Sequence, residues 1–91
     1  MSSPKELTSN QSGEWFTTEV NAIGPIENNG VYVMLTDTSG KFKNTWFYVP
    51  PTISALVNET GLSAIQNGKK VYAELTGSSP ASSVLRFHLL A

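Results

Sequence analysis

Apolar and polar residues alternate along most of this chain, which is the period of a β-strand rather than of a helix. The alternation occupies five stretches, which cover residues 14–23, 31–37, 43–49, 70–77 and 84–91. Successive side chains of a strand point to opposite faces of a sheet, so one set in each stretch can face a core. The pattern therefore predicts five strands.

The alternation also assigns side chains to faces within each strand. In the third strand it favours Phe47 and Val49 as the inward pair, because they are the more purely apolar set. The sets expected to share a face are Phe16, Thr18, Val20 and Ala22, then Val31, Val33 and Leu35, then Val71, Ala73 and Leu75, then Leu85, Phe87 and Leu89.

Turn residues separate these stretches. Gly24-Pro25 is expected to end the first strand, and Asn29-Gly30 predicts a tight turn into the second, since both residues tolerate positive φ. The segment DTSGK predicts another turn around Ser39-Gly40. Pro50-Pro51 is expected to end the third strand, because proline has no N–H to donate to the sheet.

One helical stretch follows the double proline. Thr52 is expected to be the N-cap, and Asn67-Gly68 is typical of a C-terminal stop. Thr60-Gly61 predicts either two short helical pieces or one bent helix. The residues expected on its buried face are Ile53, Leu56, Val57 and Ala64. Leu62 and Ile65 fall elsewhere on the helical wheel.

Three strands, one helix and two more strands, joined by short turns, favour an all-β fold with one helical region. We expect a five-stranded antiparallel OB-like barrel capped by the helix. The barrel closes only if the long first strand bends, so an open antiparallel sheet with one helix (α+β) remains the alternative. Residues 13–91 are expected to be this single domain, and residues 1–12 a flexible N-terminal tail.

The strand–proline–helix unit WFYVPPTISALV and the helix end that runs into a strand, IQNGKKVYAEL, resemble small bacterial OB-fold proteins. Among these, the arrangement is similar to the B subunits of subtilase-cytotoxin-type toxins. The resemblance implies an OB-type barrel and points to a ring-shaped oligomer or a ligand-binding module. Those B subunits carry a disulfide, which this cysteine-free chain cannot form. No glycan-contacting residue is carried over.

Composition restricts the partners. The net charge is −1, and Lys69-Lys70 is the only adjacent basic pair among six basic residues, which argues against a general nucleic-acid binder. No apolar run is long enough for a membrane span. The first residues lack the apolar stretch of a secretory signal, which favours a cytoplasmic protein unless a leader has been removed.

The chain offers little for catalysis. It has no cysteine and one histidine, His88, which we expect to be a solvated strand residue. Its only aspartate, Asp37, falls in a turn, and its glutamates are expected to be single and exposed, although Glu19 and Glu74 could approach across strands. We therefore expect no enzyme, no cofactor and no metal site.

Binding candidates are aromatic and loop residues. If Phe47 points inward, Trp46 and Tyr48 point outward and offer aromatic contacts. Trp15 also lies on an outward set, and the loops 24–30 and 76–83 flank the binding face of an OB barrel, which adds Asn28, Asn29 and Ser79. The sequence favours a non-enzymatic binding or interaction module, with a protein partner or a second copy. An oligosaccharide-binding or single-stranded nucleic-acid-binding OB domain is the alternative.

Overall fold

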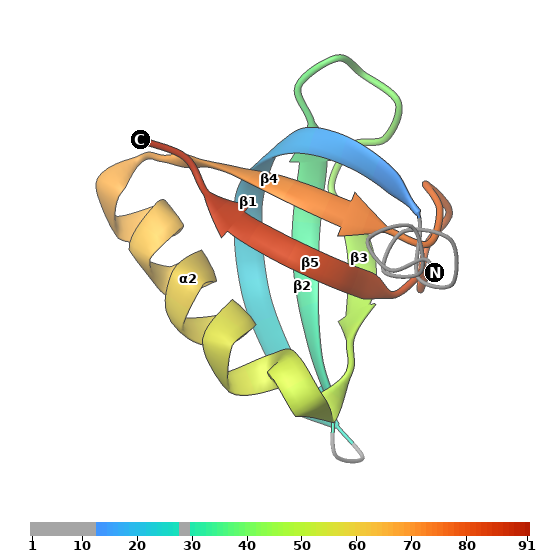
Figure 1. Ribbon diagram of the computed structural model, residues 1–91, viewed down its shortest axis with the longest axis vertical. Helices are drawn as coiled ribbons and strands as arrows, with labels where there is room; N and C mark the ends of the chain where they lie inside the picture. Colours follow the sequence, from blue (N-terminus) through green and yellow to red (C-terminus); the bar gives the residue numbers. More distant parts are fainter. Residues whose placement is uncertain (1–12, 28–29) are drawn as a thin grey trace, which may run out of the picture.

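The computed structural model describes residues 13–27 and 30–91, which form one sheet and one helical region (Figure 1). The strands are β1 (Glu14–Glu27), β2 (Gly30–Asp37), β3 (Thr45–Val49), β4 (Lys70–Leu75) and β5 (Val84–Leu89). A 3-10 turn, η1 (Pro51–Ile53), leads into the helix α2 (Ser54–Asn67). The predicted tail 1–12 and the turn residues Asn28 and Asn29 lie outside the described residues.

The five strands form one sheet in the order β3-β2-β1-β4-β5, and every neighbouring pair is antiparallel. The predicted succession of three strands, a helical region and two strands is confirmed. β1 is shared between two partners, since Glu14–Glu19 pair with β4 and residues 18–27 pair with β2. Figure 1 shows β1 as a long, curved strand.

The end of β1 was predicted wrongly. The strand does not stop at Gly24-Pro25 but continues to Glu27, with register shifts after Val20 and after Ile23. Gly24 has a φ of 100°, which a glycine adopts freely, so the chain bulges here and stays paired. The first shift also changes the side-chain parity, so Ile23 packs against the core although uninterrupted alternation would place it on the face opposite Phe16.

The core lies on the predicted inner face of the sheet. Val33, Leu35, Phe47, Val49, Val71, Ala73 and Leu75 are fully buried, as the alternation predicted. In β5 the prediction was partly wrong, because a register shift between Glu74 and Leu75 pairs Val84 with Leu75. Val84 is therefore fully buried, Phe87 is partly buried against the core, and Leu89 stays 39% exposed at the end of an edge strand.

The helix begins later than predicted. Thr52 is not an N-cap, because it lies inside η1, and α2 starts at Ser54 without a side-chain cap. Proline fixes φ near the helical value, so Pro51 suits the first position of this turn. The hydroxyl of Ser54 donates a hydrogen bond to the Pro51 carbonyl at 3.1 Å, which joins the turn to the helix.

The helix continues through Thr60-Gly61 as one element, so the alternative of two short helical pieces is wrong. Gly61 is buried against the Ile23 side chain of β1, and a Cβ at this position would collide with that side chain. Val57, Gly61 and Ala64 form the buried face. Leu56, which was predicted on this face, is 67% exposed. The glycine therefore brings the helix close to β1 instead of interrupting it.

The helix ends as predicted. Gly68 adopts a left-handed φ of 63°, and the N–H of Lys69 donates to the Ala64 carbonyl at 2.9 Å. α2 packs mainly on β1 and β5, alongside the sheet in Figure 1. Within residues 13–27 and 30–91, no helix has the length and apolarity required to cross a membrane.

The edge strand β3 contacts the segment just before the other edge strand, β5. Tyr48 of β3 and Ser83, just before β5, form an isolated parallel bridge. No continuous ladder joins β3 to β5 in the described residues, so the sheet is open. The observed architecture is a mostly antiparallel five-stranded sheet with one helix.

Candidate binding surface

Four large side chains gather on the outer face of β2 and β3. Tyr32 pairs with Tyr48 and Met34 pairs with Trp46, so each pair lies directly across the two strands. Their strand neighbours Val33 and Phe47 are fully buried, which places the four side chains on the face away from the core. All four are partly exposed. We call Tyr32, Met34, Trp46 and Tyr48 the β2–β3 aromatic face.

The loop between β4 and β5 borders this face. The N–H of Ala81 donates to the Trp46 carbonyl, and the N–H of Tyr48 donates to the Ser82 carbonyl, each at 2.9 Å. Within the loop, the N–H of Ser82 donates to the Ser79 carbonyl at 3.2 Å. The backbone therefore brings the loop of Ser79 beside Trp46 and Tyr48, which the sequence named only as separate candidates.

Trp15 belongs to a different surface. It stacks on Tyr72 of β4, with ring centroids 4.6 Å apart and an interplanar angle of 21°. Trp15 is 42% exposed and Tyr72 is 39% exposed. Tyr72 was not among the sequence candidates. Its alternation with Val71 and Ala73 placed it outward, but nothing in the sequence gave the register that brings it to Trp15.

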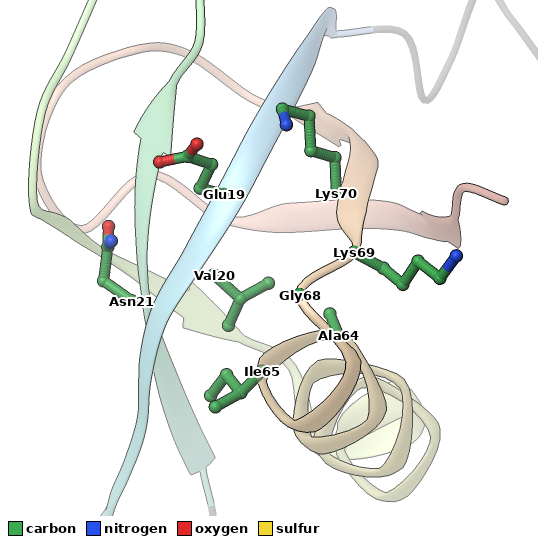
Figure 2. Close-up of a pocket in the computed structure, with 8 residues that line it drawn as sticks. All are labelled: Glu19, Val20, Asn21, Ala64, Ile65, Gly68, Lys69 and Lys70. Atoms are coloured by element: carbon green, nitrogen blue, oxygen red, sulfur yellow. The ribbon is translucent and has the colours of Figure 1, made fainter.

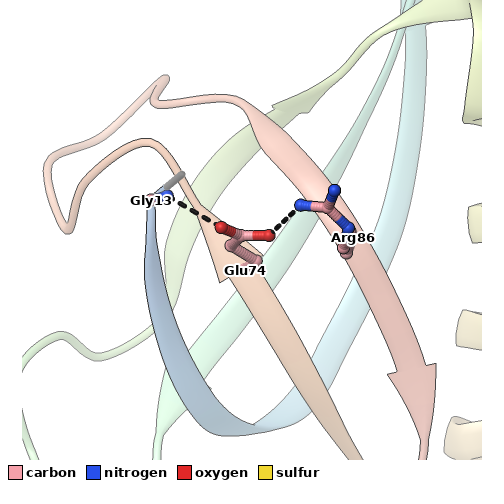
Figure 3. A network of polar contacts seen from close by, with 3 residues as sticks. All are labelled: Gly13, Glu74 and Arg86. Carbon is pink, nitrogen blue, oxygen red and sulfur yellow. Dashed lines mark hydrogen bonds and ion pairs between the residues drawn. The ribbon is translucent and has the colours of Figure 1, made fainter. Parts of the chain in front are cut away.

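Beside this pair lies the carboxylate of Glu74, which was predicted to be exposed but is buried. Glu74 is 3% exposed and forms an ion pair with Arg86 of β5 (Figure 3). Its other oxygen accepts a hydrogen bond from the N–H of Gly13 at 2.8 Å. Both carboxylate oxygens are therefore engaged. In the strand register Glu19 lies across from Lys70, whereas Glu74 lies across from Trp15, so Glu19 and Glu74 are kept apart.

A hollow of about 230 Å³ lies between β1 and the end of α2 (Figure 2). It is lined by Glu19, Val20, Asn21, Ala64, Ile65, Gly68, Lys69 and Lys70. In Figure 2 the side chains of Lys69 and Lys70 extend in different directions, so they do not converge on one anion. The positive charge of Arg86 is paired with the carboxylate of Glu74, so it does not add to that of the two lysines.

The residues with catalytic chemistry are dispersed. His88 is exposed on β5, opposite Tyr72. Among residues 13–27 and 30–91, no three histidine, aspartate or glutamate side chains lie close enough to share a metal ion. Asp37 is buried at the end of β2, where it accepts hydrogen bonds from the hydroxyl of Ser39 at 2.8 Å and the N–H of Lys41 at 2.9 Å.

The turn environment shifts the acidity of Asp37. Burial alone would raise its pKa, but the hydrogen bonds from Lys41 and Ser39, with the positive charge of Lys41, hold the pKa below the ordinary value of 3.8. The carboxylate therefore stabilises the turn while it is ionised.

Replacing Asp37 by Asn should destabilise the fold by about 1 kcal/mol at pH 7, through loss of charge-assisted hydrogen bonds. A carboxyl group whose pKa is lowered by folding contributes its full stability above the pKa of the unfolded chain, and this contribution is lost as the pH falls through the lower pKa of the folded state. The difference between Asp37→Asn and the parent should therefore shrink between pH 7 and pH 2.5 in urea titrations. An equal difference at both pH values would contradict this assignment.

No protein-family model, curated protein or solved structure matches this chain.

Proposed function

We propose that this chain is a non-enzymatic interaction module that contacts a protein partner through the β2–β3 aromatic face. The observation that carries the proposal is the direct cross-strand pairing of Tyr32 with Tyr48 and of Met34 with Trp46 on the face away from the core. Aromatic residues and methionine are enriched at the centres of protein interfaces, and charged residues are depleted there.

The physical properties of this face suit a preformed contact. None of its four side chains carries a formal charge at neutral pH, so binding requires no desolvation of an ion. Tyr32 and Tyr48 already pack edge to face, with centroids 5.6 Å apart, which limits the side-chain entropy lost on binding. Pro50 follows β3 directly, and the loop of Ser79 holds the other side of Trp46 and Tyr48.

We also infer that the sheet has the curvature of an OB-like barrel. The isolated bridge between Tyr48 and Ser83, with its neighbouring backbone hydrogen bonds, supports closure between β3 and β5. The division of β1 between β2 and β4 supports it as well, because a small barrel requires a first strand that serves two sides.

A binding role without catalysis is supported by how the acidic groups are used. The carboxylate of Asp37 accepts hydrogen bonds inside its own turn, and that of Glu74 is held by Arg86 and Gly13. The chain contains one histidine and no cysteine. A turnover assay against hydrolase and transferase substrates that loses its signal on His88→Ala would overturn this part of the proposal.

Replacing Trp46 by Ala should weaken partner binding or self-association by about 2 kcal/mol or more, which is roughly 30-fold in affinity, with little loss of fold. Sedimentation velocity over a concentration series measures self-association. If the chain is monomeric, immobilised parent and variant proteins are compared for the proteins that they retain from a cell extract. Trp15→Ala is the matched control, since it removes a second exposed tryptophan from another surface. Unchanged assembly and unchanged retained proteins for Trp46→Ala would refute the assignment.

A further inference from the structure

We propose that the stacked pair Trp15–Tyr72, together with the ion pair Glu74–Arg86, forms a second binding site whose ligand is a neutral sugar ring of an oligosaccharide. The site lies on β1, β4 and β5, whereas the β2–β3 aromatic face lies on the other half of the sheet. The inference therefore does not rest on the protein partner proposed above.

The aromatic pair leaves open surface for a third ring. Stacking uses one face of each ring, so Trp15 and Tyr72 each retain a second face. The pairing of β1 with β2 begins at Thr18, so among residues 13–27 and 30–91 no strand pairs with Trp15 on the side away from β4. This position accounts for the 42% exposure of Trp15, which is unusual for so large an apolar surface.

Polar groups flank the rings in register. Glu74 lies directly across from Trp15, Arg86 across from Glu74, and His88 across from Tyr72. Arg86 uses one terminal nitrogen on Glu74, and its side chain remains 33% exposed, so other N–H donors of the guanidinium can reach a ligand. Because Gly13 and Arg86 fix the carboxylate, the arginine is held in place before binding.

This combination suits a sugar. The axial C–H bonds of a pyranose ring form an apolar face that can lie on an aromatic ring, while its hydroxyl groups require directed donors and acceptors at the edge. Ligand sites typically join such an apolar surface to a few precisely placed polar groups. Here the open ring face of Trp15 supplies the first element, and Arg86 and His88 supply the second.

Charge distinguishes a neutral ring from a nucleotide. The charged side chains on this outer face are Glu19, Lys70, Glu74 and Arg86, in two opposite-charge cross-strand pairs. The face thus carries no net positive charge to attract phosphates, which dominate nucleic-acid affinity. A whole-chain charge of −1 acts in the same direction.

The size of the face suits one or two sugar rings. Six residues in each of three neighbouring strands span roughly 20 Å by 10 Å at normal strand spacing.

The test uses the ¹⁵N-labelled full chain and follows its two tryptophan indole signals by NMR. The probes are cellohexaose, maltohexaose, laminarihexaose, xylohexaose and mannohexaose, each to 10 mM, with a ten-residue oligothymidylate and a hexagalacturonate as charged comparators. We expect at least one neutral probe to shift the Trp15 signal while the Trp46 signal stays in place. Trp15→Ala should weaken that binding at least tenfold, and Trp46→Ala, the matched control, less than twofold.

The remaining outcomes overturn the proposal. They are no shift of the Trp15 signal with any neutral probe at 10 mM, stronger binding of a charged comparator, or a Trp15 signal that responds only to dilution, which would indicate a second copy. The measurement on the unmodified chain requires no variant to fold. Since the protein-partner proposal is tested at Trp46, either proposal can fail while the other holds.

Discussion

Replacing Phe47 by alanine should lower the free energy of unfolding by about 3–5 kcal/mol, whereas the same change at Trp46 should lower it far less. Phe47 is fully buried and packs edge to face on Phe42, with ring centroids 4.9 Å apart. A small domain has a total stability on the order of 5–15 kcal/mol, so losing this ring removes a large part of it. Trp46 lies on the opposite face of the same strand and is partly exposed.

Urea denaturation followed by far-UV circular dichroism measures both variants against the parent. Phe47→Leu serves as the control for ring removal, because it keeps most of the apolar volume and should cost less than Phe47→Ala. A stable Phe47→Ala variant together with an unfolded Trp46→Ala variant would reverse the parity of β3. That result would also move the β2–β3 aromatic face to the wrong side of the sheet.

Strand positions and most of the core were predictable because the period of two is local. Val33, Leu35, Val71 and Ala73 could be assigned to a face without knowledge of any pairing partner. Phe42 was missed, because it lies in the turn before β3, outside the alternating stretch. It is buried by tertiary packing on Phe16 and Phe47, which no local pattern reports.

Errors arose where the register shifts. One extra residue after Val20 turned Ile23 toward the core, and another shift at Glu74–Leu75 made Val84 rather than Leu85 the buried residue. A bulge reverses the parity of everything beyond it, and the sequence signals it weakly. The role of Gly61 in the helix was also not predictable from local sequence. A glycine is needed there because the Ile23 side chain of β1 approaches closely, and that contact comes from another element.

The binding candidates show the same difference between what a local pattern predicts and what the strand register determines. Trp46, Tyr48 and the loop of Ser79 were identifiable as outward or loop residues, and the structure brings them together. The grouping of Trp15 with Tyr72, and of Glu74 with Arg86, depends on the register between strands far apart in sequence. Single residues of a site could thus be predicted, but their combination into a surface could not.

Replacing Arg86 by alanine should destabilise the protein by about 2–3 kcal/mol, more than an ordinary surface substitution. The change leaves the carboxylate of Glu74, 3% exposed, with only the N–H of Gly13 as its described partner. Removing one member of a buried ion pair costs about 3–5 kcal/mol, because the remaining charge is not compensated. We expect the smaller cost of about 2–3 kcal/mol here, because the Arg86 side chain is 33% exposed and solvent screens part of the interaction.

A second substitution, at Glu74, distinguishes the effect of an uncompensated buried charge from the effect of lost side-chain packing. In the double variant Arg86→Ala/Glu74→Gln, the amide oxygen can still accept from Gly13 while no charge is buried, so most of the lost stability should return. Urea titrations of the parent, both single variants and the double variant complete a double-mutant cycle. If Glu74→Gln fails to restore stability in the Arg86→Ala background, the arginine acts through its aliphatic stem. The fixed ion pair beside Trp15 would then lose its role in holding the start of β1 against β4.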